Sequence, residues 1–119
     1  MNSIKIDRKQ LLAIVTENQK KHVIEYLDAV EDYKAAAIKL SQQNLKLAKS
    51  GDLAKLSQIR ALPQKPVSYE DNYTRAIRML ELSVEDVIDV EEHIFNQLVL
   101  DEWGWKQQFT AMASSYKSL

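Results

Sequence analysis

The sequence predicts an all-α fold, and three observations lead to this prediction. Only two glycines and two prolines occur among 119 residues, which is too few for the many turns of a β-sandwich or barrel. Hydrophobic residues make up 45% of the chain, enough to form a core. No Gly or Pro interrupts residues 8–49. We therefore expect a single domain over residues 1–119, with a long N-terminal helix, a short helix and a C-terminal helical pair.

The long helix is predicted to cover residues 8–49. Asp7 followed by Gln10 is a variant of the capping box that opens helices, and Gly51 suits the position just after a helix end. Such a helix would be about 60 Å long at roughly 1.5 Å per residue, longer than a globule of this chain length. It must therefore bend back or find a partner.

One face of this helix carries an apolar seam at a strict spacing of seven. Its apolar members are Leu12, Tyr26, Tyr33, Leu40 and Leu47. The seam predicts either packing against the rest of the same domain or the joining of copies in a homo-oligomer. A second apolar side of the helix is formed by Ile14, Ile24, Leu27, Ile38 and Leu45.

The prolines and the helix-capping residues divide the chain into three predicted segments. Asp52 opens a short helix, so residues 8–61 form a part used for packing and oligomerisation. Residues 62–67 contain both prolines and make an extended connector. Residues 68–119 form the C-terminal helical part.

The C-terminal part is predicted to contain two helices with one ambiguous stretch between them. Ser68 precedes the first helix, which runs to about residue 82. Residues 84–90 are rich in β-branched side chains and are a possible short extended segment. The final helix begins near Asp89 and continues to about residue 115.

The sequence carries no recognisable enzyme motif. It has no cysteine, no glycine-rich phosphate loop and no zinc-binding His-Glu pattern, and its only histidines are His22 and His93. We expect His22 to be a packing residue of the long helix. We therefore expect no enzymatic activity, no catalytic residue, no cofactor and no bound metal.

Charge is distributed unevenly along the chain. Between Met79 and Trp105 there are eight acidic residues and no Lys or Arg. This run indicates either a solvated acidic face or a docking surface for a basic protein. The residues predicted to form that surface are Glu91, Glu92, Asp101, Glu102 and Trp105.

The two tryptophans flank Gly104, and helical spacing puts their rings on different sides. We expect Trp103 inside the core and Trp105 at an interface. Gly104 then either lets a neighbouring helix approach closely or ends one helix before the next begins.

A small phosphorylated ligand is an alternative partner. Arg75 and Arg78 share a predicted helix with Tyr69 and Tyr73, and arginine binds phosphate with two parallel hydrogen bonds. Ion pairs with nearby carboxylates are the competing explanation for both arginines. Direct binding of nucleic acid is not expected, because the isoelectric point is near 6.1 and no basic patch has interleaved aromatic residues.

The run YTRAIRMLELSVEDVIDVEEHIFNQLVLDEWGWKQQF resembles small accessory proteins of bacteriophages and mobile elements, as a general type. The resemblance implies a protein that blocks a host factor, as counter-defence inhibitors of the anti-CRISPR type do. It equally implies a sponge for a signalling nucleotide, or a virion or assembly component. It assigns a role to no individual residue.

These observations predict a non-enzymatic helical interaction protein. It would form a homo-oligomer and would inhibit or scaffold a partner protein. The first alternative is an oligomeric sponge for a phosphorylated nucleotide, and the second is a virion accessory protein. The N-terminus has no apolar signal region, and no apolar stretch is long enough to span a membrane, so we expect a cytoplasmic location.

Overall fold

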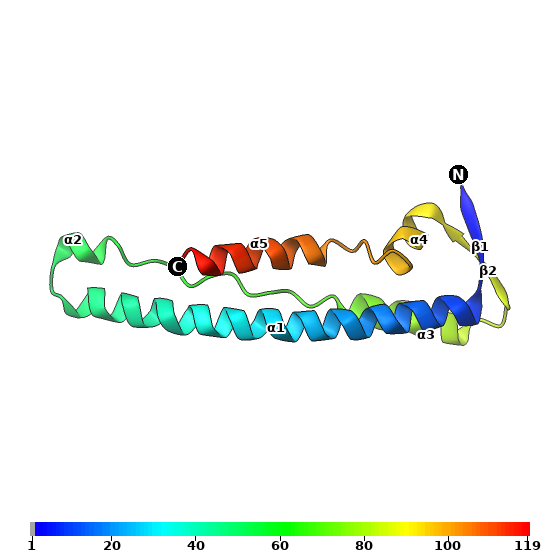
Figure 1. The fold of residues 1–119 in the computed structure, drawn as a ribbon, viewed down its shortest axis with the longest axis horizontal. Coiled ribbons are helices and arrows are strands. Elements are labelled where there is room, and N and C mark those ends of the chain that lie inside the picture. Colours follow the sequence, from blue (N-terminus) through cyan, green and yellow to red (C-terminus); the bar gives the residue numbers. More distant parts are fainter. Residues whose placement is uncertain (1) are drawn as a thin grey trace. The chain divides into compact units, whose positions relative to one another are not determined.

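The computed structural model describes residues 2–119 as a mainly helical fold with one small sheet (Figure 1). The prediction of a mainly helical chain with a long N-terminal helix is confirmed, although a purely α fold overstated it. The elements in order are β1 (Ser3–Asp7), α1 (Arg8–Lys49), α2 (Leu53–Leu56), α3 (Glu70–Leu82), β2 (Val87–Glu91), α4 (Glu92–Leu98) and α5 (Trp105–Lys117).

The sheet joins two segments that are far apart in the sequence. β1 and β2 pair antiparallel, with Ile4 opposite Val90 and Ile6 opposite Ile88. Residues 84–90, for which an extended segment was one possibility, contain most of β2, whereas β1 was not predicted. A five-residue strand has little stability of its own, so β1 depends on its pairing with β2.

α1 begins and ends where its capping residues predicted. The backbone N–H of Gln10 donates to the Asp7 carboxylate at 2.9 Å, which caps the first turn. At the other end, Gly51 has φ of +71°, the left-handed conformation that closes a helix. Figure 1 shows one uninterrupted helix between these points.

The C-terminal half differs more from expectation. α3 matches the predicted helix, but the expected single helix after it is divided into α4 and α5. Between them, Asp101 has φ of +59° and Gly104 has φ of +88°. Because residues in this left-handed region cannot continue an α-helix, the chain must restart at Trp105. Open space lies where a Cβ of Gly104 would point, so the backbone angle, not a close helix approach, is the reason for glycine there.

The chain divides into two compact units. Unit 1 contains the residues up to Tyr26 and Val67–Lys106, and unit 2 contains Leu27–Pro66 and Gln107–Leu119. α1 contributes residues to both. The core of unit 1 is formed by Leu11, Val15, Tyr73, Leu80, Val90 and Leu98.

Candidate functional site

Four rings of unit 1 form an aromatic cluster, which we define as the buried His22, Tyr73 and Trp105 and the partly buried Tyr69. The ring of His22 lies 4.7 Å from that of Trp105 and 5.4 Å from that of Tyr73, measured between centroids. Its Nε2 atom accepts a hydrogen bond from the backbone N–H of Tyr69 at 2.8 Å. His22 is thus the packing residue that the sequence predicted, and it fixes the start of α3 against α1.

A chain of hydrogen bonds runs through this cluster. The indole N–H of Trp105 donates to the hydroxyl oxygen of Tyr73 at 2.7 Å, and the Tyr73 hydroxyl donates to the carboxylate of Asp101. Lys106 lies 3.7 Å from the other oxygen of that carboxylate. The Trp105 N–H, the Tyr73 hydroxyl and the Asp101 carboxylate therefore each have a hydrogen-bond partner, which offsets the cost of removing them from water.

Burial shifts the pKa values of two members of the cluster. Burial raises the pKa of the Tyr73 hydroxyl, and its hydrogen bond to Asp101 raises it further. Burial lowers the pKa of His22 below its usual 6.5, while the negative charges of Asp101 and Glu70 act in the opposite direction. Both groups are therefore held in their neutral forms at pH 7.

These contacts correct the expected positions of the two tryptophans. Trp105 is fully buried, whereas Trp103 is only partly buried at the edge of the core. Asp101 is also buried, at 7% exposure. The expectation that Trp105 and Asp101 lie on a docking surface is therefore wrong, because the hydrogen-bond chain holds both inside unit 1.

The residues proposed to bind a phosphorylated ligand are not brought together. Tyr73 lies in the core, and its hydroxyl is used within unit 1. The guanidinium of Arg75 donates to the side chain of Asn72 at 2.8 Å, and Arg78 is exposed. A ligand site built from these groups is therefore not supported by their placement.

The predicted seam of α1 is covered by the chain itself. Leu12 packs against the core of unit 1, and Leu40 is 1% exposed. In unit 2, the ring of Tyr33 lies 6.1 Å from that of Tyr116, and Leu47 lines a pocket. In unit 1, Tyr26 stacks on His22. Contacts within the chain therefore bury Leu40 and partly bury the other seam residues, whereas the second apolar side of α1 is exposed at Ile24, Leu27, Ile38 and Leu45.

Unit 1 has an apolar groove of about 430 Å³, which we call the β2 groove. One wall is formed by Ala76, Met79 and Leu80 of α3, and another by β2. Asp89 and Glu91 of β2 also border it, with their side chains on the exposed face of the strand, opposite that of Ile88 and Val90. The β2 groove therefore combines an apolar lining with negative charge.

Exposed apolar side chains continue along the elements that form this groove. Met79 and Leu82 on α3 are 74% and 75% exposed, and Val84 in the following loop is 93% exposed. Val87 on β2 is 53% exposed. Large apolar side chains that lie together on a surface mark sites where proteins bind other molecules.

The second edge of β2 is open. The N–H of Arg8 donates to the carbonyl of Asp86, and the N–H of Glu92 donates to that of Asn2. In an antiparallel pair, hydrogen bonds alternate along each strand, so the N–H and C=O groups of Val87 and Asp89 point away from β1. No hydrogen bond to these groups occurs within residues 2–119.

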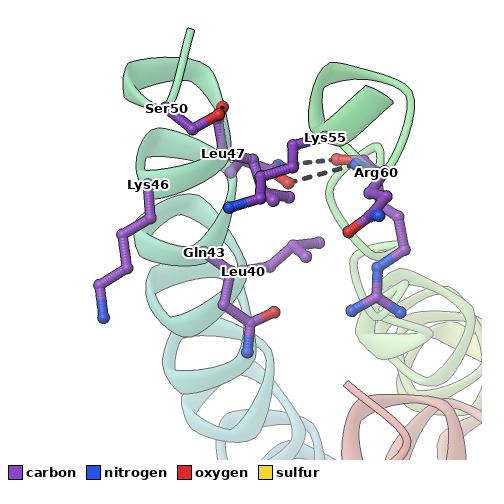
Figure 2. Close-up of a pocket in the computed structure, with 9 residues that line it drawn as sticks. Leu40, Gln43, Lys46, Leu47, Ser50, Lys55 and Arg60 are labelled. Carbon is purple, nitrogen blue, oxygen red and sulfur yellow. Dashed lines mark hydrogen bonds between the residues drawn. The ribbon is translucent and has the colours of Figure 1, made fainter. Parts of the chain in front are cut away.

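Unit 2 has a basic pocket of about 620 Å³ between the end of α1 and residues 55–60 (Figure 2). Three of its lining residues are cationic, namely Lys46, Lys55 and Arg60, and none is acidic. No sequence pattern predicted this pocket. Its residues come from segments whose approach depends on the turn after α1.

Comparison with known proteins adds no assignment. No protein family, curated protein or solved structure matches this chain. Within residues 2–119, no group of three His, Asp or Glu side chains is placed to hold a metal ion. Over the same residues, no helix has the length and apolar character needed to cross a bilayer.

Proposed function

We propose that this chain is a non-enzymatic binding protein whose unit 1 binds an extended basic segment of a partner protein in the β2 groove. The observation that carries the proposal is the open edge of β2 beside an apolar groove bordered by acidic residues. An unpaired strand edge offers backbone donors and acceptors to an incoming strand, and the adjacent groove selects its side chains.

β1 indicates which side chains such a strand needs. Its isoleucines, Ile4 and Ile6, are on the partly buried face, while Lys5 between them is opposite Asp89 on the exposed face. A strand added to the other edge of β2 meets the same alternation. It therefore places apolar residues toward the groove and cations beside Asp89 and Glu91.

Binding in the β2 groove would inhibit the partner protein or hold it in place as a scaffold. A segment held in the β2 groove is withdrawn from its other contacts, and this mode of action needs no turnover. Resemblance to phage and mobile-element accessory proteins suggests the same class of activity, binding to and blocking a host protein. The exposed carboxylates of Glu92 and Glu102 add attraction for a basic partner.

A labelled peptide with alternating isoleucine and lysine tests the proposal directly. Fluorescence anisotropy should show binding that weakens as salt is added, because the carboxylates attract the lysines. An alternating isoleucine and glutamate peptide should not bind. Methylating the peptide amides that face β2 should abolish binding, while methylating the opposite amides should leave it intact.

Two variants of equal charge change locate the site. Asp89→Lys with Glu91→Lys alters the β2 groove and should weaken binding of the lysine peptide by about tenfold or more. Glu17→Lys with Glu81→Lys alters exposed acids of unit 1 that do not line the groove and should weaken it much less. Equal weakening by both pairs would show that the peptide is held by general charge attraction and not by the β2 groove.

The same proposal includes a homodimer formed through the exposed stripe of α1 in unit 2. Leu27, Ile38 and Leu45 are 56%, 61% and 54% exposed and share one helix face with Glu31 and Lys34. In an antiparallel pair that sets Leu27 opposite Ile38, Glu31 of each copy is opposite Lys34 of the other. This register therefore pairs apolar with apolar and acid with base over residues 27–38 of the stripe.

Light scattering on two variants tests the homodimer. Ile38→Glu places a charge within the stripe and should give a monomer. Leu53→Glu makes the same kind of change at an exposed leucine outside α1 and should leave the dimer intact. A monomeric unmodified protein at micromolar concentration would exclude this part of the proposal.

A further inference from the structure

The basic pocket of unit 2 is formed by two segments held together by one asparagine. The side chain of Asn44 donates to the carbonyl of Arg60 at 2.8 Å and accepts from its N–H at 3.2 Å. Both bonds are drawn in Figure 2. Because one side chain holds both backbone groups of Arg60, the far wall of the pocket has a defined position relative to α1.

The three cations of the pocket have no carboxylate partner within residues 2–119. Elsewhere in the chain, Lys34 pairs with Glu31 and Lys106 with Asp101. Residues 33–66 contain seven Lys or Arg and a single acid, Asp52. The carboxylate of Asp52 accepts the N–H of Ala54 at 2.9 Å as the cap of α2. Apart from Lys34, the cations of this region therefore have no carboxylate partner within residues 2–119.

Helix capping accounts for only part of this charge. Lysines in the last turn of α1 stabilise its negative end, which explains Lys46. Lys55 lies in the single turn of α2, which has little dipole of its own, and Arg60 belongs to no helix. The carbonyl of Leu47 already accepts the Ser50 hydroxyl at 2.7 Å, which reduces the negative potential that the helix end presents to the pocket.

The arrangement of the cations indicates a ligand with several anionic groups. Figure 2 shows Lys46 projecting from the side of α1 that faces away from Arg60, with Gln43 and Lys55 between the two. Cations spread in this way suit several phosphates better than one. Arg60 offers a bidentate fork for one phosphate, and the lysines act as point charges for others.

We propose that this pocket binds a small molecule carrying two or more phosphate groups. Its volume of about 620 Å³ lies within the range of small-molecule sites. Leu40 and Leu47 line the pocket and supply apolar contact for the part of the ligand that carries the phosphates. This site is separate from the β2 groove, so each proposal stands or fails independently.

Isothermal titration calorimetry with inorganic tripolyphosphate, ATP and inorganic phosphate tests the site. Tripolyphosphate and ATP should bind, and inorganic phosphate should bind at least about tenfold more weakly, because one phosphate reaches fewer cations. Tighter binding of ATP than of tripolyphosphate would support contact with the apolar lining. No heat from either polyphosphate up to about 1 mM would overturn the proposal.

Two double variants of equal charge change separate the pocket from diffuse attraction. Lys55→Gln with Arg60→Gln should weaken tripolyphosphate binding by about tenfold or more. Lys39→Gln with Lys117→Gln removes two cations of unit 2 that do not line the pocket and should weaken it by less than about threefold. Circular dichroism checks that both variants remain folded.

Binding of a single-stranded oligonucleotide tests the alternative that this region is a general surface for polyanions. If it binds more tightly than ATP and both double variants weaken it equally, the region is a general polyanion surface, and the proposal is wrong. If ATP binds and the oligonucleotide loses affinity only in the pocket variant, the pocket is the phosphate site.

Discussion

Unit 1 and unit 2 share α1 but use it differently. Unit 1 contains eight Lys or Arg and thirteen Asp or Glu, a net charge of −5. Unit 2 contains eight and four, a net charge of +4. The nearly neutral total of −1 therefore conceals two regions of opposite charge. Each region has its own candidate site, and each site suits a ligand of opposite charge.

The two units also differ in how their structure is specified. Unit 1 contains a buried hydrogen-bond chain from Trp105 through Tyr73 to Asp101. In unit 2, residues 51–62 are exposed, and α2 has only one turn. There the Tyr116 hydroxyl donates to the carbonyl of Gln64 at 2.7 Å. Buried polar contacts therefore define unit 1, whereas surface contacts hold much of unit 2.

The largest expected effect comes from removing the indole at the centre of unit 1. Trp105→Ala should lower the free energy of unfolding by about 3–5 kcal/mol, because it leaves a large cavity and breaks the hydrogen-bond chain. Urea denaturation followed by circular dichroism measures the change. Trp103→Ala should have a smaller effect, since Trp103 is only partly buried. The reverse order would contradict the assignment of Trp105 to the core.

A change of one hydroxyl tests the hydrogen-bond chain by itself. Tyr73→Phe keeps the ring but leaves the Asp101 carboxylate and the Trp105 indole N–H without that partner. We expect a loss of about 1–3 kcal/mol in the free energy of unfolding. If stability is unchanged in urea titrations, the chain of bonds does not contribute to specifying unit 1.

The pH dependence of stability reports on His22. Its pKa is lowered in the folded state, so the unfolded chain binds the proton more readily. The free energy of unfolding should therefore be highest above pH 6.5 and should fall as the pH drops below that value. His22→Gln should flatten this dependence between pH 5 and 7, relative to the unmodified protein. His93→Gln is the control, because His93 is exposed.

The smallest effect is expected in the exposed part of unit 2. Leu53 is 81% exposed, and α2 buries no residue. Leu53→Ser should change the free energy of unfolding by less than about 0.5 kcal/mol. A loss of several kcal/mol in thermal or urea unfolding would show that the difference between the two units has been overstated.

Local signals explain what could be predicted from the sequence. The bounds of α1 follow from Asp7, Gly51 and the absence of breakers between them, all of which act within one or two turns. The apolar face of α3 follows from helical spacing in the same way. Its residues Tyr73 and Leu80 are indeed buried.

Long-range contacts explain what could not be predicted. β1 is defined by a partner more than eighty residues away, and no local pattern identifies that partner. The division between α4 and α5 depends on the left-handed conformation of Asp101, whose carboxylate is held by Tyr73. Because of this division, Trp105 is buried and Trp103 is only partly buried, which is the reverse of the prediction. Both pockets likewise combine segments that only the fold brings together.

The proposed function depends most on the open edge of β2, and amide hydrogen exchange tests that edge most directly. With the alternating isoleucine and lysine peptide bound, exchange at Val87 and Asp89 should slow, because their N–H groups point to the edge that the peptide occupies. Exchange at Lys5 on β1 should not change. Unchanged exchange at Val87 and Asp89 under saturating peptide would contradict strand addition at β2.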